Sequence, residues 1–215
     1  GFQHFYGFLG GETSQWEPAL INDFTAVQPP HEKKNYHLST DLADHAIGWL
    51  QNQKAYADDK PFLLYFAPGA GHGPHHIFKE WADKYKGKFN DGWEAYRERV
   101  FNRQKEMGWI PSNAQLTPRD KTQAAWTDIP ESERAFQTRL MEVYAGFLEH
   151  TDHHVGRLIQ AIQDLGVLDD TLIYYIIGDN GASAEGTPNG TFNEYYSLNG
   201  ASSMESVDFM VSTIN

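Results

Sequence analysis

The chain has 215 residues, of which 40% are hydrophobic and 14% aromatic, so it is long enough and apolar enough for one globular α/β domain. Its formal net charge of −12 disfavours a nucleic-acid partner, because binding to phosphates requires clustered Lys and Arg. Cysteine is absent, which excludes disulfides and a thiol nucleophile within these residues, and no apolar run approaches the length of a membrane span.

The two ends of the sequence predict a fragment. Gly1 opens it without an initiator Met or a signal peptide, and Asn215 directly follows a short apolar run over residues 207–214. We therefore expect a piece cut from a longer chain, although an engineered start would look the same.

Residues 1–36 are dense in Gly, Pro and aromatic residues and follow neither a helical nor a strand period. This composition predicts an ordered loop that its rings hold in place. Long structured loops often carry function, so the segment is a candidate substrate wall, but we favour packing as the reason for its aromatic residues.

A helix is predicted over residues 38–51, because their apolar residues fall on one side. Ser39 or Thr40 is expected to cap its first amides, and His45 is most simply a surface residue of this helix. The apolar run 61–68 comes next and predicts a short buried strand. A helix followed by a strand is half of a βαβ unit.

Three histidines follow this strand in the Gly- and Pro-rich residues 69–76. His72 lies on a predicted rigid turn at the strand end, which suits hydrogen bonding to an anion or ligation of a metal. The spacing of His72, His75 and His76 matches no zinc signature. For His75 and His76 we favour solvated loop positions, whereas for His72 the functional and the structural interpretation stay open.

Residues 77–130 are interpreted as a surface excursion or cap inserted into the same domain. They contain several lysines, and a helix is predicted over residues 92–107, with an apolar stripe on one face and charges on the solvated face.

The longest predicted helix runs from Asp128, as its cap, to about Leu165, and Gly166 is the expected stop. His150, His153 and His154 lie along it, and helical geometry places His150 and His154 on one side. The general-base Glu of the metalloprotease pattern is absent, since position 151 is Thr. We therefore favour a structural role for these histidines over a metal site.

The continuous apolar run 171–178 predicts a strand buried on both faces, as in a parallel sheet covered by helices. Asp179 and Asn180 follow at its carboxyl end, where open α/β sheets bind ligands. Their oxygens suit a hard cation such as calcium or magnesium better than zinc. The alternative is a strand followed by an Asn-Gly turn, which is common in proteins of every kind.

Four stretches of the chain follow one another in the same order as similar stretches of a known family: 7–16, 67–76, 144–158 and 177–182. Together they resemble the middle of a bacterial arylsulfatase, and the resemblance covers most of the chain. It implies the α/β fold of the alkaline-phosphatase-like superfamily, in which a central sheet is sandwiched between helices. This fragment is expected to contain only part of that fold. Residues 1–215 would then be part of one sulfatase catalytic domain.

The resemblance also implies the chemistry, which is hydrolysis of sulfuric esters at a calcium site, with magnesium as the alternative cation. Asp179 and Asn180 match metal ligands of the family, and His72 matches a histidine that hydrogen-bonds the substrate sulfate. The family nucleophile is a formylglycine made from the Cys or Ser of a Cys/Ser-x-Pro-x-Arg motif, which this sequence lacks. The N-terminal Asp-Asp metal pair of the family and the Lys and His partners of its nucleophile region are missing too, so the isolated chain is expected to be inactive.

Two alternatives accompany the sulfatase interpretation. A phosphodiesterase or phosphonate hydrolase of the same fold would use the same strand-end metal, and the isolated chain could also be a non-catalytic module. The expected partner is a small-molecule or glycan sulfate ester, and the resemblance alone suggests a periplasmic or secreted location.

Overall fold

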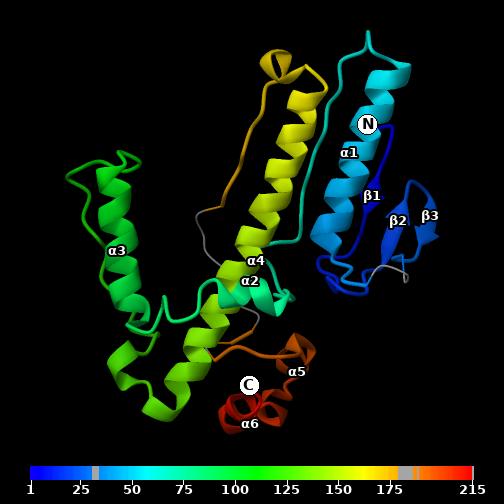
Figure 1. The fold of residues 1–215 in the computed structure, drawn as a ribbon. Helices are drawn as coiled ribbons and strands as arrows, with labels where there is room; N and C mark the ends of the chain where they lie inside the picture. The colour runs from blue at the N-terminus through cyan, green and yellow to red at the C-terminus, as the bar shows by residue number, and fades with distance from the viewer. Residues whose placement is uncertain (31–33, 179–185, 188, 215) are drawn as a thin grey trace. The chain divides into compact units, whose positions relative to one another are not determined.

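The computed structural model describes residues 1–30, 34–178, 186–187 and 189–214, which divide into two compact units. Unit 1 consists of Gly1–Trp81 and Tyr144–Ser183, and unit 2 consists of Ala82–Val143 and Ala184–Asn215. The long helix α4 (Glu131–Asp164) contributes its first part to unit 2 and the rest to unit 1 (Figure 1).

Unit 1 opens with a three-stranded antiparallel sheet in the order β1-β2-β3. Its strands are β1 (Tyr6–Gly7), β2 (Leu20–Asn22) and β3 (Thr25–Val27). Asp23 begins the turn between β2 and β3 with a positive φ of 54°, and its carboxylate accepts a 2.8 Å hydrogen bond from the amide of Phe5. The prediction of a loop without strands in residues 1–36 is therefore wrong, because strands of two or three residues are too short to show an alternating pattern.

Helix α1 (Leu38–Tyr56) confirms the predicted helix, but its cap differs from the prediction. His37 is the N-cap residue, and its Nδ1 accepts a 3.1 Å hydrogen bond from the amide of Ser39. An imidazole nitrogen thus replaces the Ser39 or Thr40 hydroxyl that we expected in this role.

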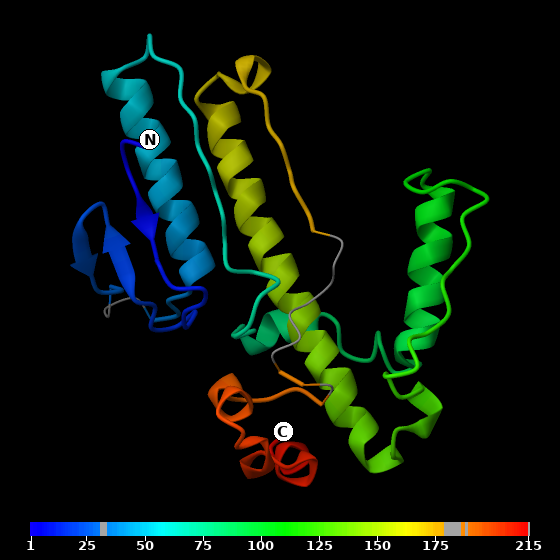
Figure 2. The same ribbon diagram turned by 180° about the vertical axis from the view of Figure 1, so that it is seen from behind.

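Two apolar clusters hold unit 1 together. The first centres on Leu20, Leu38 and Leu42, which join the small sheet to α1. The second centres on Leu50, Leu158 and Ile162, which join α1 to the C-terminal part of α4. The extended segment that follows α1 runs between α1 and α4 (Figures 1 and 2), and its alternate residues Phe62, Leu64 and Phe66 pack against the second cluster.

The two predicted buried strands are extended in the structure but pair with no other strand among the described residues. Residues 61–68 turn only one face toward the core, since Leu63 and Tyr65 are 76% and 75% exposed. In residues 171–178, Ile176 is 85% exposed. The prediction of burial on both faces is wrong for this structure. A strand is buried on both faces only when a layer covers each face. Among the described residues, α1 and α4 cover one face of residues 61–68, and the other face, with Leu63 and Tyr65, stays exposed.

Unit 2 is built largely from helices. Helix α3 (Gly92–Glu106) confirms the predicted helix over residues 92–107. The short helices of unit 2 were not predicted; they are η1 (Trp126–Asp128), α5 (Glu194–Leu198), η3 (Ser202–Met204) and α6 (Val207–Ser212). Asp128, the expected cap of the longest helix, lies in η1, and α4 begins at Glu131. Helix α2 (Lys79–Asp83) belongs partly to each unit, and η2 (Leu168–Asp170) follows α4 in unit 1. The boundaries 77–130 of the predicted excursion stay a prediction.

Gly92 is the residue that allows α3 to start beneath η1. Its φ is +87°, and a Cβ at this position would overlap the indole ring of Trp126. The Trp126 ring also packs edge-on against Trp93, with centroids 4.9 Å apart. Only glycine satisfies both the left-handed backbone and this close approach.

None of the helices in the described part of the chain combines the length and the apolar composition that a membrane span requires.

Candidate active site

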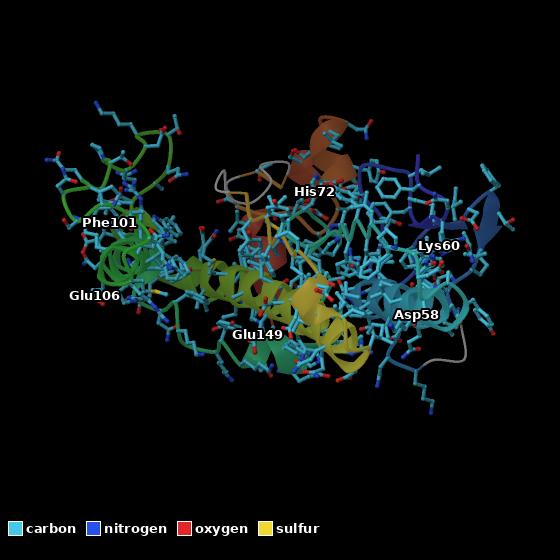
Figure 3. All side chains as sticks on the ribbon, turned by 90° about the horizontal axis from the view of Figure 1, so that it is seen from above. Asp58, Lys60, His72, Phe101, Glu106 and Glu149 are labelled. Carbon is cyan, nitrogen blue, oxygen red and sulfur yellow. The ribbon has the colours of Figure 1, made fainter. Side chains whose placement is uncertain are left out.

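His72 lies on the loop that follows the extended segment 61–68. The loop turns tightly, because the His72 amide donates to the Gly69 carbonyl at 3.2 Å and Gly71 adopts a φ of +96°. Figure 3 shows His72 apart from Asp58 and Lys60, which precede the extended segment. This agrees with the predicted turn at the end of an extended run.

Two oxygen atoms of the described residues lie beside Nδ1 of His72. Nδ1 lies 2.9 Å from the Gly73 carbonyl oxygen and 3.7 Å from the Glu12 carboxylate. The side chain of His72 is 45% exposed and that of Glu12 22%. A carbonyl can only accept, so the proton of this edge lies on Nδ1.

The N-terminal segment packs against the same loop through His76. The amide of Gln15 donates to Nδ1 of His76 at 3.4 Å, and the Trp16 indole stacks on the His76 ring with centroids 5.9 Å apart. His75 packs edge-on against Tyr144 of α4, at 5.1 Å. The prediction that His75 and His76 are merely solvated is wrong, because aromatic residues far away in the sequence cover both.

His37 joins this loop to α1 as a neutral ring. Its Nδ1 accepts from the Ser39 amide, so its proton lies on Nε2, which donates to the His76 carbonyl at 3.0 Å. The ring is only 1% exposed, and burial lowers the pKa of His37 to about 4. Burial also lowers the pKa values of His75 and His76.

His150 and His154 continue the histidine cluster on α4. Arg157 donates to Nδ1 of His154 at 2.9 Å, so the His154 proton lies on Nε2, within 2.9 Å of the Thr40 hydroxyl and 3.1 Å of Nε2 of His150. Burial, with Arg157 as a second cause, lowers the pKa of His154 to about 4.

These contacts confirm the structural interpretation of His150 and His154, both of which are buried. His153 is exposed on the same helix. Within the described ranges, no group of three or more His, Cys, Asp or Glu side chains is arranged to hold a metal ion.

Asp179 and Asn180 lie outside the residues that the structure describes. Their convergence with His72 therefore stays a prediction. Sequence reasoning missed Glu12 and His37 as neighbours of the histidine loop. The stretch 7–16 contributed to the resemblance as a whole, but nothing in its local pattern singled out the Glu12 carboxylate.

Comparison with known families decides the identity of the chain. A sequence model of the family described as Sulfatase matches residues 1–213. The chain belongs to the sulfatase family. Membership of the sulfatase family implies the alkaline-phosphatase-like α/β fold, and the helices and small sheet of the described residues are a mixed α/β arrangement consistent with part of it.

Two curated sulfatases illustrate the similarity. An uncharacterized sulfatase of Schizosaccharomyces pombe is 33% identical over an alignment of 197 residues, and the match covers 85% of this chain and 35% of that protein. An arylsulfatase of Klebsiella aerogenes is 26% identical over an alignment of 196 residues, and the match covers 85% of this chain and 40% of that protein. The chain therefore spans less than half the length of these sulfatases.

Proposed function

We propose that the complete protein is a sulfuric ester hydrolase and that this chain supplies part of its catalytic domain. The family match over residues 1–213 carries the proposal, and similarity to the Klebsiella aerogenes arylsulfatase supports an arylsulfatase-like activity on a small-molecule or glycan sulfate ester.

In this proposal, residues 61–68 and 171–178 are strands of the central sheet that helices sandwich in the alkaline-phosphatase-like fold. Their exposed apolar side chains, Leu63, Tyr65 and Ile176 among them, support this assignment. Neighbouring strands would cover such side chains and use the unpaired backbone groups.

His72 is the proposed sulfate-binding residue. Its half-exposed ring is accessible to a ligand, and the tight loop and the Gly73 carbonyl hold its orientation before any substrate arrives. A donor that is already positioned needs no reorganisation when negative charge grows on the leaving oxygen, and this preorganisation is what makes such donors effective.

Asp179 and Asn180 are the proposed ligands of a divalent cation, calcium or magnesium, because carboxylate and amide oxygens are what hard cations prefer. Calcium takes six or more oxygens, so further ligands would come from other parts of the protein. When bound, the cation would offset the negative charge of the sulfate. The nucleophile of the proposed reaction is a formylglycine outside these 215 residues.

A substrate comparison on the complete protein tests the proposal. With calcium present, an aryl sulfate should give a higher kcat/KM than an aryl phosphodiester or an aryl phosphonate. His72→Ala should lower kcat/KM for the sulfate roughly 100-fold or more, whereas the exposed control His153→Ala should change it little. Preference for the phosphodiester or phosphonate would instead favour the alternative hydrolase of the same fold.

The isolated 215-residue chain should show no sulfatase turnover, because the proposed nucleophile and several metal ligands lie elsewhere. This follows the third interpretation, in which the chain alone is a non-catalytic module. Turnover by the isolated chain that disappears in His72→Ala would contradict this part of the proposal.

A further inference from the structure

Glu12 presents a buried carboxylate oxygen to the proposed sulfate-binding histidine. Its Oε2 atom has no hydrogen-bond partner among the described residues and lies 3.7 Å from Nδ1 of His72. A carboxylate oxygen withdrawn from water is costly unless a donor or a positive charge compensates it. The His72 ring is placed to provide that compensation.

Hydrogen bonds fix the backbone that carries Glu12. The Ser14 hydroxyl accepts from the amides of Trp16 and Glu17 at 3.2 and 3.1 Å, and the Gln15 carbonyl accepts from the Leu38 amide at 2.9 Å. The segment also approaches the histidine loop closely, since a Cβ on Gly69 would come within 3.3 Å of the Gln15 side chain. Glu12 is therefore held beside His72 by the fold and does not reach it by chance from a free terminus.

The carboxylate stands on the edge of the ring that carries Nδ1, the atom that also lies 2.9 Å from the Gly73 carbonyl. Both oxygens favour a proton on this nitrogen, and the negative charge of Glu12 additionally favours the doubly protonated ring. Besides Glu12, His75 of the same loop is close enough to interact electrostatically with His72. A second proton on Nε2 would make that opposite edge of the ring a donor toward an anion.

We propose that Glu12 is a positioning residue for His72, which holds the Nδ1 edge in place and keeps the ring cationic so that Nε2 can donate to a sulfate ester. The role toward the ester rests on the proposed function, whereas the pairing of the carboxylate with the ring does not.

Histidine NMR titration of the complete protein, labelled at the imidazole Cε1 and without substrate, tests the pairing. The His72 resonance is assigned by its loss in His72→Gln. Replacing Glu12 by Gln should lower the titration midpoint of His72 by about one pH unit, as expected for loss of an opposite charge within 4–6 Å. The control Glu17→Gln removes the same charge from the same segment at an exposed position and should leave the midpoint within about a fifth of a unit.

An unchanged midpoint in Glu12→Gln, or an equal shift in both variants, would overturn the proposal. Glu12→Asp provides a second measurement in case Glu12→Gln does not fold, because it withdraws the carboxylate from the ring by one methylene group. The titration midpoint of His72 should then fall by less than about one unit, and an unchanged midpoint would overturn the pairing equally.

Measurements of sulfatase activity then test whether the pairing of Glu12 with His72 affects hydrolysis. If the complete protein hydrolyses aryl sulfates, the alkaline limb of its pH profile in kcat/KM should shift to lower pH by about one unit in Glu12→Gln and return toward the original in Glu12→Asp. A lower rate without a shift would show that Glu12 only supports the loop, which contradicts the proposed charge role. Absence of any sulfatase activity would refute the proposed function but leave the titration result intact.

Discussion

His150 and His154 lie one turn apart on α4 with their Nε2 atoms 3.1 Å apart, and His154 also reaches the Thr40 hydroxyl of α1 at 2.9 Å. His37, at the start of α1, lies against His150 with ring centroids 4.3 Å apart. These rings link α1 to α4. A ring nitrogen that accepts a hydrogen bond, such as Nδ1 of His37 or of His154, carries no proton, so protonation of that nitrogen would break the bond.

The stability of the chain should therefore fall at acidic pH. The pKa values of His37 and His154 lie near 4 in the folded state, below the ordinary value of 6.5, so the unfolded state takes up protons first. Stability is full above about pH 6.5 and is lost as the pH falls from there to about 4, by about 3 kcal/mol per ring. Urea unfolding measured across this range should show the loss.

Two variants on the same helix test whether the cluster causes this loss. His154→Gln should clearly reduce the change in unfolding free energy between about pH 7 and pH 4.5, because it removes one of the two rings whose pKa lies near 4, while the shifts of His37, His75 and His76 remain. His153→Gln removes an exposed ring that contributes less than burial and Arg157 to the lowered pKa of His154, so it should change the pH dependence only slightly. An equal pH dependence in all three proteins would contradict the assignment.

Asp41 is a buried residue of α1 that connects this helix to the N-terminal segment by hydrogen bonds. Its carboxylate accepts hydrogen bonds from the hydroxyls of Tyr6 at 2.5 Å and Tyr36 at 3.0 Å, and Asp41 is only 4% exposed. Burial is the main cause that raises the pKa of both tyrosines above the ordinary value of 10, and the charge and hydrogen bond of Asp41 add to it.

Replacing Asp41 by Ala should lower the free energy of unfolding by about 2–4 kcal/mol, because two part-buried hydroxyls lose a charged acceptor. Asp58→Ala, in which an exposed partner of Lys54 is removed, should cost less than about 1 kcal/mol. Both values come from urea unfolding at neutral pH, and similar costs for the two variants would show that the Asp41 contacts are weak.

Gly92 and Gly108 offer a matched pair for unit 2. Both have positive φ values, of +87° and +73°, but a Cβ would strike Trp126 only at Gly92, whereas at Gly108 it would meet no atom within 4 Å. Gly108→Ala should cost about 1–2 kcal/mol from the backbone alone, and Gly92→Ala about 1–3 kcal/mol more from the clash. Equal losses in thermal or urea unfolding would mean that the Trp126 ring moves aside freely.

The long helices α1, α3 and α4 were predictable because each contains enough residues to repeat its apolar spacing. Helix α4 keeps that period across 34 residues, and α1 and α3 do so across 19 and 15. The cap of α1 was not predictable, because an imidazole nitrogen that accepts a hydrogen bond leaves no mark in the sequence. The strands β1 to β3 were missed because three residues cannot show a period.

The sheet and the site depend on partners that no local pattern reveals. Residues 61–68 are extended as predicted, but the burial of such a run depends on layers and strands from distant parts of the sequence, and here Leu63 remains exposed. In the same way His72 stood out by its place after a predicted strand. Glu12, 60 positions earlier, became its neighbour only through folding.

The central claim is that His72 and the pair Asp179 and Asn180 serve one site that binds a cation beside a sulfate. A crystal structure of the complete protein with calcium and inorganic sulfate, with the calcium located by its anomalous signal, tests this claim most directly. The account predicts calcium bound to the oxygens of Asp179 and Asn180 and a sulfate oxygen within hydrogen-bond distance, about 3 Å, of His72. Calcium bound elsewhere, or a sulfate remote from His72, would contradict it.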